Sequence, residues 1–367
     1  MKELIVAKKL PNMKIGVVLD KSTPKNIYYS QIVPMVENVI KYQTEIIAHN
    51  SLPIKKPRTA SYKGYNFLCK ILFYSEYEIL YVRSELLFMR LFIARYFIRN
   101  KYKICFDFRG LDSAESKYKH SNPIKEVVLK NIERFIYRNS DYLLAVSNRL
   151  KSHLHLMYGA RQVFVQPCMV TKNVEKVFFP ITENDKIRFV YVGGVSGWQN
   201  INKMLLMFSE ISKGTVQCYL TIITNDLSSV ISKIKKNKIV NVEVKSIDDR
   251  NLLLEELTKH DFGFLIRDDI LMNNVSSPIK YVEYISHGVI PILTKGIGDY
   301  SMLTIEHNLG IVLDTCEISM DKLFEIRNDP KIYKRLYKVS KTLIWSPMKT
   351  PLNTIGKRLI NRPTIDV

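Results

Sequence analysis

Apolar runs of strand length alternate along the chain with longer segments of helical periodicity. In the first half these runs lie at residues 13–19, 45–49, 79–82, 103–108, 141–147 and 161–170. In the second half they lie at residues 187–192, 218–226, 240–247, 262–266, 289–294 and 310–314. Strands that alternate with helices pair in parallel, and the helices then cover both faces of the sheet. The pattern therefore predicts an α/β chain with doubly wound, Rossmann-like sheets.

The length of the chain bounds the number of such sheets. With 367 residues, the chain is long enough for two domains of about 150 to 200 residues each. The apolar run at 161–170 leads out of the first domain, and we place a linker at about residues 168–184. We therefore predict an N-terminal domain over residues 1–172 and a C-terminal domain over residues 173–345.

Composition and cysteine usage predict a folded, cytoplasmic protein. Hydrophobic residues make up 46% of the chain and charged residues 25%, as in soluble globular proteins. The N-terminal segment is interrupted by lysines too early for a signal peptide, and no apolar run reaches the roughly 18 residues of a membrane span. The cysteines are odd in number, widely spaced and without a CxxC pair, which argues against disulfides and zinc; they are Cys69, Cys105, Cys168, Cys218 and Cys316.

The net charge of +20 is concentrated in the first half of the chain. Residues 1–180 carry 30 lysines and arginines against 14 acidic residues, whereas residues 181–367 carry 25 against 21. This distribution favours an anionic partner for the N-terminal half, namely a membrane surface, a nucleic acid or an anionic substrate. A general preference for lysine at neutral surface positions explains the charge equally well, so charge alone does not choose the partner.

Residues 85–99 predict a helix in which aromatic residues are interleaved with Arg90, Arg95 and Arg99. The arginines argue against a membrane-spanning segment, but they suit an interfacial helix whose cations meet lipid phosphates. The alternative is a crossover helix between two parallel strands, because such helices are buried on most sides and are often equally apolar.

The stretch 262–300 shows the clearest pattern of a binding site. A buried strand is followed by a polar loop, by a helix that opens at Ser277-Pro278, and by a second buried strand. Ser277 is predicted as the N-cap and Pro278 as the first helical residue. The free N–H groups of the first turn, together with Lys280, then form an anion site. At the end of a parallel strand the usual anion is phosphate.

The segment SSPIKYVEYISHGVIPILTKG, residues 276–296, resembles the nucleotide-sugar motif of retaining GT-B glycosyltransferases. The resemblance is to the bacterial family-four enzymes that build capsules and lipopolysaccharide. It implies a GT-B fold, in which two doubly wound Rossmann-like domains face each other across a cleft. It also implies that Glu283 holds the ribose of the donor. Val275 stands where the commoner pattern of the family has an earlier glutamate.

Two further segments resemble the same family. The phrase DFRG, followed by a glutamate, is similar to the edge of the family's cleft, so Asp107 and Arg109 are expected to orient the sugar or the acceptor. Asp112 and Glu115 are further candidates after the same strand. The alternative is that Asp107 and Arg109 only pair or cap the next helix. The segment around Trp345 resembles the family's closing segment, and residues 346–367 are therefore expected to return to the N-terminal domain.

A leaving diphosphate needs positive charge in an enzyme that works without a metal. In many relatives the turn matched here by Gly193-Gly194 is followed by an arginine and a lysine. Trp198-Gln199 replace the arginine, and Lys203 matches the lysine. We expect Arg267 to supply the missing charge, unless it is a surface arginine paired with Asp268 or Asp269. The predicted catalytic residues are thus Lys280, Arg267, Asp107 and Arg109, and the predicted donor-binding residues are Glu283, Ser277, Ser276, Gly193, Gly194, Trp198 and Lys203.

Several signatures of metal or cofactor chemistry are absent from the sequence. There is no DxD motif, no phosphate-binding Walker loop and no HExxH pair. Asp268 and Asp269 are adjacent, which is the wrong spacing for two carboxylates around one metal. We expect no metal and no cofactor, because the nucleotide-sugar is itself a substrate.

The resemblance and the basic first domain point to a lipid-linked glycan as the acceptor. The corresponding process is surface polysaccharide biosynthesis (capsule, O-antigen or lipopolysaccharide), with peripheral contact to the anionic inner face of the cytoplasmic membrane; a nucleic-acid partner is not expected. Alternatives with the same architecture are a nucleotide-sugar epimerase and a DNA-modifying glucosyltransferase, and a third hypothesis is a non-catalytic binding subunit. Turnover without an acceptor indicates an epimerase, and duplex binding with a steep salt dependence indicates a DNA modifier.

Overall fold

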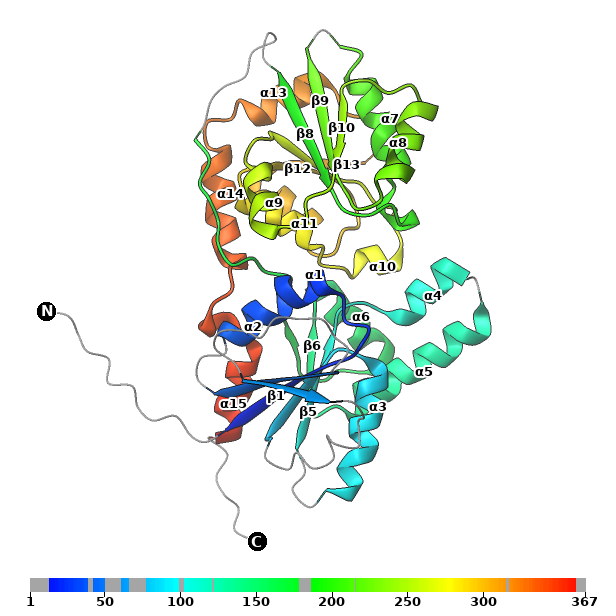
Figure 1. Cartoon of the computed structure of the whole chain (residues 1–367), viewed down its shortest axis with the longest axis vertical. Helices are drawn as coiled ribbons and strands as arrows, with labels where there is room; N and C mark the ends of the chain where they lie inside the picture. The colour runs from blue at the N-terminus through cyan, green and yellow to red at the C-terminus, as the bar shows by residue number, and fades with distance from the viewer. Residues whose placement is uncertain are drawn as a thin grey trace, which may run out of the picture. The chain divides into compact units, whose positions relative to one another are not determined.

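The computed structural model describes residues 13–38, 42–49, 61–65, 77–98, 102–120, 122–177, 186–214, 216–314 and 317–360. Contacts divide the chain into two compact units (Figure 1), Met1–Pro167 with Trp345–Val367, and Cys168–Ile344. The sequence had placed the two boundaries at residues 172 and 346. Cys69, Arg99, Cys316 and residues 178–184 of the predicted linker lie outside the described residues.

The first unit is built on a seven-stranded parallel sheet with the order β3-β2-β1-β4-β5-β6-β7. Its apolar runs become strands because both faces of the sheet are covered, and the segment 61–65 is a strand that the sequence analysis did not predict. The strands are β1 (Lys14–Leu19), β2 (Gln43–His49), β3 (Ser61–Tyr65), β4 (Ile79–Val82), β5 (Lys103–Phe108), β6 (Tyr142–Ala145) and β7 (Val163–Val165).

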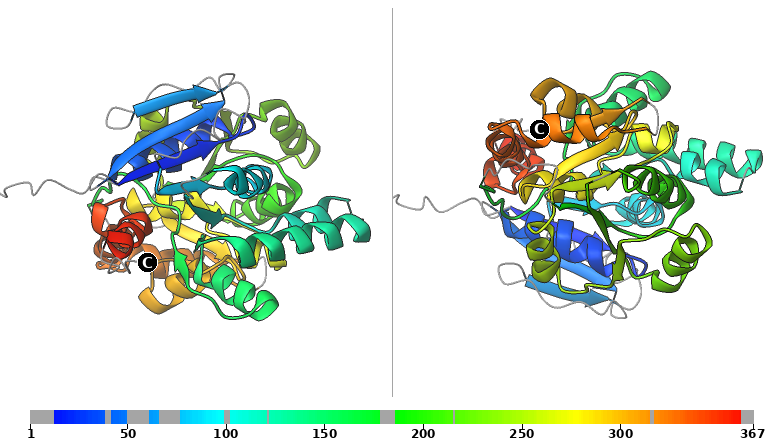
Figure 2. Two further views of the ribbon diagram at one scale, coloured as in Figure 1. Left: turned by 90° about the horizontal axis from the view of Figure 1, so that it is seen from below. Right: turned by 90° about the horizontal axis from the view of Figure 1, so that it is seen from above.

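Helices connect these strands, and side chains close several of the helix starts. Ser84, Asn122 and Ser147 each accept a hydrogen bond from a first-turn backbone N–H, which satisfies a donor that the helix leaves unpaired. Helices α4 and α5 form a hairpin that extends from the sheet (Figure 1 and Figure 2). The helices are α1 (Lys25–Ile27), α2 (Val33–Asn38), α3 (Glu85–Ala94), α4 (Asp112–His120), α5 (Pro123–Asn139), α6 (Asn148–Tyr158) and α15 (Pro351–Ile360), with a π-helical turn at Tyr28–Ile32.

The C-terminal segment packs within the first unit. In α15 the Asn353 side-chain amide donates to the carbonyl of Asn38, and the Tyr42 hydroxyl donates to the Asn353 carbonyl at 3.3 Å. Residues 85–94 form α3, as the crossover interpretation of residues 85–99 predicts, and the interfacial interpretation stays a prediction. The helix connects β4 to β5 and buries Leu87 and Phe88, while its opposite side is exposed. Among the described helices, none combines the length and the apolar character that crossing a bilayer requires.

The second unit contains a six-stranded parallel sheet with the order β10-β9-β8-β11-β12-β13. The predicted α/β class with doubly wound sheets is therefore confirmed in both units. The strands are β8 (Ile187–Val192), β9 (Cys218–Ile223), β10 (Val242–Lys245), β11 (Phe262–Leu265), β12 (Ile290–Thr294) and β13 (Ile311–Leu313). The helices are α7 (Ile201–Ile211), α8 (Leu227–Lys236), α9 (Arg250–Leu257), α10 (Leu271–Asn274), α11 (Ile279–Ser286), α12 (Tyr300–His307), α13 (Met320–Arg327) and α14 (Ile332–Ser340).

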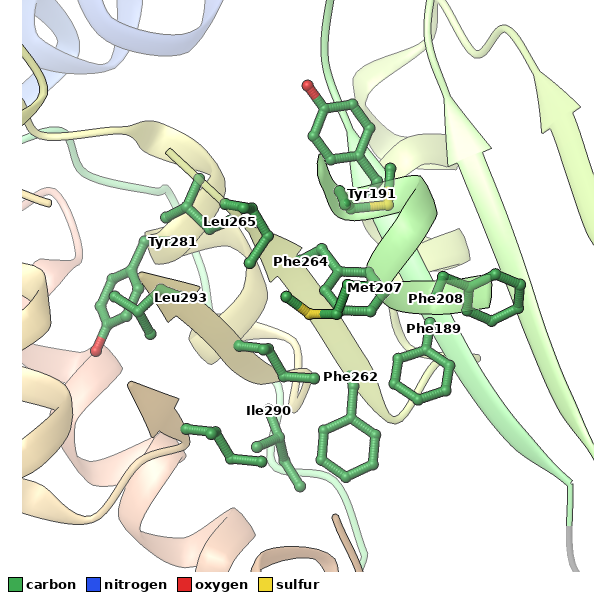
Figure 3. Close-up of a cluster of buried hydrophobic side chains, with 14 of the residues drawn as sticks. Phe189, Tyr191, Met207, Phe208, Phe262, Phe264, Leu265, Tyr281, Ile290 and Leu293 are labelled. Carbon is green, nitrogen blue, oxygen red and sulfur yellow. The ribbon is translucent and has the colours of Figure 1, made fainter. Parts of the chain in front are cut away.

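Aromatic side chains from neighbouring strands fill the centre of the second unit (Figure 3). The Phe189 ring of β8 stacks on the rings of Phe262 and Phe264 of β11, with centroids 5.5 and 5.2 Å apart, and meets Phe208 of α7 edge-on. Each such ring, when fully buried, contributes about 1.5 to 3 kcal/mol of transfer free energy. This core fixes β8 beside β11, so the ends of these two strands are also held side by side.

Helix α11 lies close to β11 because Gly263 has no side chain. A Cβ atom on Gly263 would lie 2.6 Å from ring carbons of Tyr284, which is fully buried. The Tyr284 hydroxyl lies 3.2 Å from the backbone N of Val192 and 3.3 Å from the carbonyl of Phe264. Tyr284 therefore links α11 to the ends of both β8 and β11.

We expect Gly263→Ala to destabilise the second unit by about 1 to 3 kcal/mol, because the added methyl group displaces the Tyr284 ring from a packed core. Differential scanning calorimetry measures the loss. Gly110→Ala is the control, since a Cβ atom at Gly110 meets nothing within 4 Å. Equal effects of the two substitutions would contradict the packing account.

Candidate functional site

The candidate site lies at the carboxyl edge of the second sheet, where β8 and β11 are neighbours. From β8 the chain moves outward to β9 and β10 and then returns to β11 on the other side. The loops after β8 and β11 therefore diverge, and doubly wound sheets bind their ligands at such a point. Gly193-Gly194 follow β8, Arg267 lies just beyond β11, and α11 starts at the same edge because it connects β11 to β12.

The amine of Lys280 lies directly against the backbone of Gly193. Gly193 has a φ of 138°, and a Cβ atom there would lie 2.1 Å from Lys280 Nζ. Only glycine accepts both the conformation and the contact. Lys280 Nζ donates to Gln199 Oε1, lies 3.4 Å from the Tyr191 hydroxyl, and sits 4.5 Å from the centroid of the Tyr191 ring. The structure thus brings together the predicted residues Gly193 and Lys280.

Tyr191 and Gln199 complete this cluster, and neither was among the predicted site residues. The Tyr191 hydroxyl lies 2.8 Å from Gln199 Oε1 and 2.7 Å from the carbonyl of Gly194. Burial raises the pKa of Tyr191, so the phenol stays neutral. The sequence places Trp198 and Gln199 after the two glycines. Only the structure shows that they lie in the short 3-10 helix Gly197–Gln199 and that the Gln199 amide turns back toward Lys280. Trp198 itself is partly exposed.

Arg267 is the second cation at this edge. Its Nη1 lies 3.3 Å from Asn273 Oδ1 and 3.4 Å from Ser276 Oγ, while its Nε is buried and has no hydrogen-bond partner among the described residues. The alternative of an ion pair between Arg267 and Asp268 or Asp269 is not observed. Asp268 instead lies 3.9 Å from Lys203, and both of these side chains are well exposed, so the predicted Lys203 belongs to a weak surface pair.

Within the described ranges, neither Lys280 nor Arg267 lies within ion-pair distance of a carboxylate. Burial, and next the nearby charge of Arg267, hold the pKa of Lys280 well below its ordinary value. Burial also lowers the pKa of Arg267 to about 10. Desolvation and mutual repulsion thus act on two cations that share one electrostatic field, and a bound anion would relieve both.

The predicted helix cap at Ser277 is wrong. Helix α11 begins at Ile279, and Pro278, with a ψ of 123°, is the non-helical residue before it. Ser277 is therefore one position too early, and its Oγ instead accepts a hydrogen bond from the Cys168 backbone at 3.1 Å and bonds the Tyr300 hydroxyl at 2.7 Å. Pro278 has no side-chain group that could cap α11, and among the described residues the first N–H groups of the helix are left for a ligand or water.

A second loop fixes the shape of the segment that carries Arg267 and Ser276. Gly298 has a φ of 46°, and a Cβ atom there would lie 1.8 Å from the Ser276 carbonyl oxygen. The backbone N–H of Gly298 donates to the Asn273 carbonyl at 3.1 Å, and the buried Asn273 amide donates to the Asp268 carbonyl at 2.9 Å. The loop after β12 is therefore packed against the loop after β11.

Glu283 lies one turn beyond Lys280 on α11 and is buried. Its Oε1 is 2.8 Å from Nη1 of Arg250, the first residue of α9. Arg250 is not among the residues predicted from the sequence. Val275, where the resembled motif has an earlier glutamate, is only 2% exposed, so this position holds a packed aliphatic side chain.

The other predicted residues, Asp107 and Arg109, belong to the first unit. Asp107 Oδ2 lies 3.1 Å from Arg83 Nε and 3.5 Å from Arg109 Nη1, and it accepts a hydrogen bond from the Tyr81 hydroxyl. Asp107 is completely buried. Arg109 also donates to the Gln166 carbonyl at 2.7 Å. The alternative of pairing is thus observed, with Arg83 as a third member that the sequence did not indicate.

This cluster keeps some hydrogen-bonding capacity. Asp107 Oδ1 and Arg83 Nη2 are buried and have no hydrogen-bond partner among the described residues. One carboxylate faces two guanidinium groups, so the cluster carries a net positive charge at the carboxyl ends of β4 and β5. Within the described residues, no group of three or more acidic, histidine or cysteine side chains could hold a metal ion.

Comparison with solved structures identifies the fold. The sequence matches no protein-family model and no curated protein. The structure is similar to a sucrose-phosphate synthase from Thermosynechococcus elongatus, with a TM-score of 0.69 and 13% identity over 95% of this chain and 99% of that one. It is also similar to WaaG, a glycosyltransferase involved in lipopolysaccharide biosynthesis, with a TM-score of 0.65 and 11% identity over 93% and 99% of the chains.

A third similar structure is an α-glucosyltransferase in complex with UDP and a DNA that contains an HMU base. Its TM-score is 0.61, with 13% identity over 95% of this chain and 99% of that one. These likenesses extend over nearly the whole chain and both units. At such low identity they establish the fold alone, and any reaction has to be inferred from the residues of the site. The protein has the GT-B glycosyltransferase fold that the sequence predicted.

We expect Asp107→Ala to destabilise the first unit by about 3 to 5 kcal/mol, because it leaves Arg83 and Arg109 as uncompensated cations in a buried setting. Calorimetric unfolding measures the change. Asp112→Ala is the matched control, since that carboxylate is exposed in the first turn of α4 and contributes at most about 1 kcal/mol. If Asp107→Ala left the free energy of unfolding unchanged, the arginines would need no buried counter-charge.

Proposed function

We propose that the protein is a glycosyltransferase that moves a sugar from a nucleotide-sugar donor to an acceptor hydroxyl. The observation that carries the proposal is the positive edge of the second sheet. There the uncapped start of α11, Lys280 and Arg267 converge without a neutralising carboxylate in the described residues. A nucleoside diphosphate group provides the charge that this edge lacks.

In the proposed reaction the bond between the anomeric carbon and the diphosphate breaks, and a bond to the acceptor oxygen forms. Negative charge grows on the departing diphosphate, and Lys280 and Arg267 stabilise it more strongly than they stabilise the bound donor. The leaving phosphate oxygen accepts the proton of the incoming hydroxyl on the same face of the sugar, which retains the anomeric configuration. We propose that this chemistry proceeds without a metal or another cofactor.

We assign Glu283 to the ribose of the donor. It lies on α11 one turn beyond Lys280, as a ribose lies beyond a diphosphate in a nucleotide. Arg250 holds one of its carboxylate oxygens at 2.8 Å and thereby orients the other toward a hydroxyl pair. Because Val275 is aliphatic and buried, Glu283 is the acidic residue of the motif that remains for this contact.

The acceptor side is assigned to the first unit. The resemblance to capsule and lipopolysaccharide enzymes, and the excess of cations in residues 1–180, support a lipid-linked glycan in surface polysaccharide biosynthesis. Asp107 holds Arg83 and Arg109 at the ends of β4 and β5, where they are placed to orient a sugar or an anionic part of the acceptor. Such an enzyme would work at the cytoplasmic face of the membrane.

A DNA-modifying glucosyltransferase is the second candidate, because one structure of the same fold holds UDP and DNA. The two functions share the donor site and differ only in the acceptor. Duplex binding whose affinity falls steeply with salt would support this candidate. Transfer to a lipid-linked saccharide would support the first.

The test of the donor site is a thermal-shift and turnover screen with UDP-, GDP-, dTDP- and CMP-sugars in the presence of EDTA. We expect one donor to raise the Tm and to be hydrolysed slowly. Lys280→Met should weaken binding of the corresponding nucleoside diphosphate by about 10- to 100-fold, because a charged hydrogen bond contributes about 1.5 to 3 kcal/mol.

Lys295→Met is the matched control for that substitution. Lys295 follows β12 at the same edge, but it is mostly exposed and pairs with Asp314. Glu283→Gln should weaken nucleoside diphosphate binding and leave pyrophosphate binding unchanged. If no donor binds to the folded protein, or if both lysine substitutions act equally, the proposed donor site is wrong.

The lowered pKa of Lys280 makes a separate prediction about pH. A bound diphosphate raises this pKa again, so binding should take up a proton at pH values between the lowered pKa of Lys280 in the free protein and its raised pKa in the complex. Affinity should therefore fall as pH rises through this interval. Calorimetric titration in two buffers with different ionisation enthalpies measures the proton uptake. Lys280→Arg should abolish it, because arginine stays charged throughout this range; unchanged uptake would assign the proton to another group.

A further inference from the structure

The Lys280 side chain crosses the end of β8 to reach its neighbours. Successive residues of a strand point to opposite faces of the sheet, so Tyr191 and Val192 point to opposite sides of β8. Tyr284 of α11 packs on the Val192 side, and Figure 3 shows the Tyr191 hydroxyl turned away from the aromatic core. Lys280 starts from α11 and still lies over the Tyr191 ring. This path is open because Gly193 has no side chain.

Among the described residues, the groups in contact with the Lys280 amine carry no negative charge. Gln199 Oε1 accepts a hydrogen bond from the amine, and the Tyr191 hydroxyl and ring centroid lie 3.4 and 4.5 Å from it. The remaining neighbour is the backbone of Gly193. An amide does not ionise, and burial raises the pKa of Tyr191, so neither side chain becomes a counter-ion. A dipole and a ring face therefore hold the amine without cancelling its charge.

The Gln199 amide is itself fixed in one orientation. Its Oε1 lies 2.8 Å from the Tyr191 hydroxyl, so two donors converge on this one oxygen. The backbone N–H of Gln199 donates to the Ser196 carbonyl at 2.8 Å, which closes the 3-10 turn that carries the amide. A protonated lysine has three N–H donors. Gln199 takes one of them and the Tyr191 ring covers another side, which leaves a donor for a phosphate oxygen.

We propose that Gln199 and Tyr191 are positioning residues that hold the Lys280 amine at the diphosphate site and leave its positive charge free for the ligand. The inference rests on the proposed assignment of Lys280 to the donor diphosphate. It adds a requirement on residue type, because position 199 must carry a neutral acceptor. A carboxylate there would bond Lys280 more strongly and would cancel the field that attracts an anion. A role confined to closing the 3-10 turn would tolerate both, since glutamine and glutamate have nearly the same shape.

The first test is calorimetric titration with inorganic pyrophosphate. We expect Gln199→Glu to weaken binding by about tenfold or more without lowering the Tm, because it supplies a resident counter-charge. Gln199→Leu removes the acceptor and should weaken binding by about three- to tenfold. Tyr191→Leu should have an effect of about the same size, and Tyr191→Phe, which keeps the ring, should restore most of the affinity.

Two controls separate this role from general effects of charge and folding. Gln217→Glu adds the same charge at an exposed position that likewise accepts from a tyrosine hydroxyl, that of Tyr219 at 3.3 Å, and it should bind pyrophosphate like the wild type. In a Lys280→Met background the Gln199→Leu substitution should have no further effect, because a positioning residue acts through the residue that it holds.

A second measurement needs no ligand. NMR titration of the Lys280 amine in the free protein should give a pKa higher by about one pH unit or more in Gln199→Glu, because an opposite charge favours the protonated amine. Gln217→Glu should leave that pKa unchanged. If pyrophosphate binding depends on Lys280 but Gln199→Glu binds like the wild type, the positioning role is wrong and the donor site stands. An unchanged pKa in Gln199→Glu also overturns the role. If the wild type does not bind pyrophosphate, the donor assignment is wrong and the positioning role falls with it.

Discussion

The second unit depends on holding two cations, Lys280 and Arg267, at one sheet edge without a carboxylate in the described residues to neutralise them. Burial lowers the pKa of both side chains, and the nearby charge of Arg267 lowers that of Lys280 further, so the arrangement costs free energy. Neutral groups offset part of this cost, since Gln199 Oε1 accepts a hydrogen bond from the Lys280 amine and the Tyr191 hydroxyl lies 3.4 Å from it. Gly193 leaves room for that amine. A site assembled in this way is matched to an anion that arrives later, because a resident carboxylate would cancel the field that binds it.

In the first unit, by contrast, the buried cations are paired with a carboxylate. Arg83 and Arg109 are held by Asp107, which is fully buried and also accepts from Tyr81. A buried ion cluster is weak evidence of stabilisation, but it fixes the direction of its arginines. The contrast fits the two proposed tasks. A diphosphate needs free positive charge, whereas an acceptor needs donors that keep a defined orientation.

The fold by itself does not select the reaction. Structures that share 11 to 13% identity with this chain include a sucrose-phosphate synthase, a lipopolysaccharide enzyme and an α-glucosyltransferase bound to UDP and DNA. What they share with this protein is a pair of parallel sheets whose carboxyl edges can receive ligands. The proposed donor chemistry therefore depends on Lys280, Arg267 and Glu283, and the proposed acceptor on the charge of the first unit. Val275, where the motif that the segment 276–296 resembles has an earlier glutamate, is a buried aliphatic side chain, so Glu283 is the acidic residue of this segment on which the proposal depends.

The sequence by itself determined the α/β class, most strands, the positions of Gly193 and Arg267 just beyond strand ends, and that of Lys280 in the first turn of the next long helix. It could do so because burial on both faces leaves continuous apolar runs, and because parallel strands end at a common edge. Only the tertiary structure decided which side chains meet. Ser277 bonds Cys168 and Tyr300 instead of capping α11, Gln199 turns back to Lys280, and Arg250 and Arg83 reach Glu283 and Asp107. These partners are distant in sequence, and hydrogen bonds and ion pairs between separate elements leave no periodic signal along the chain.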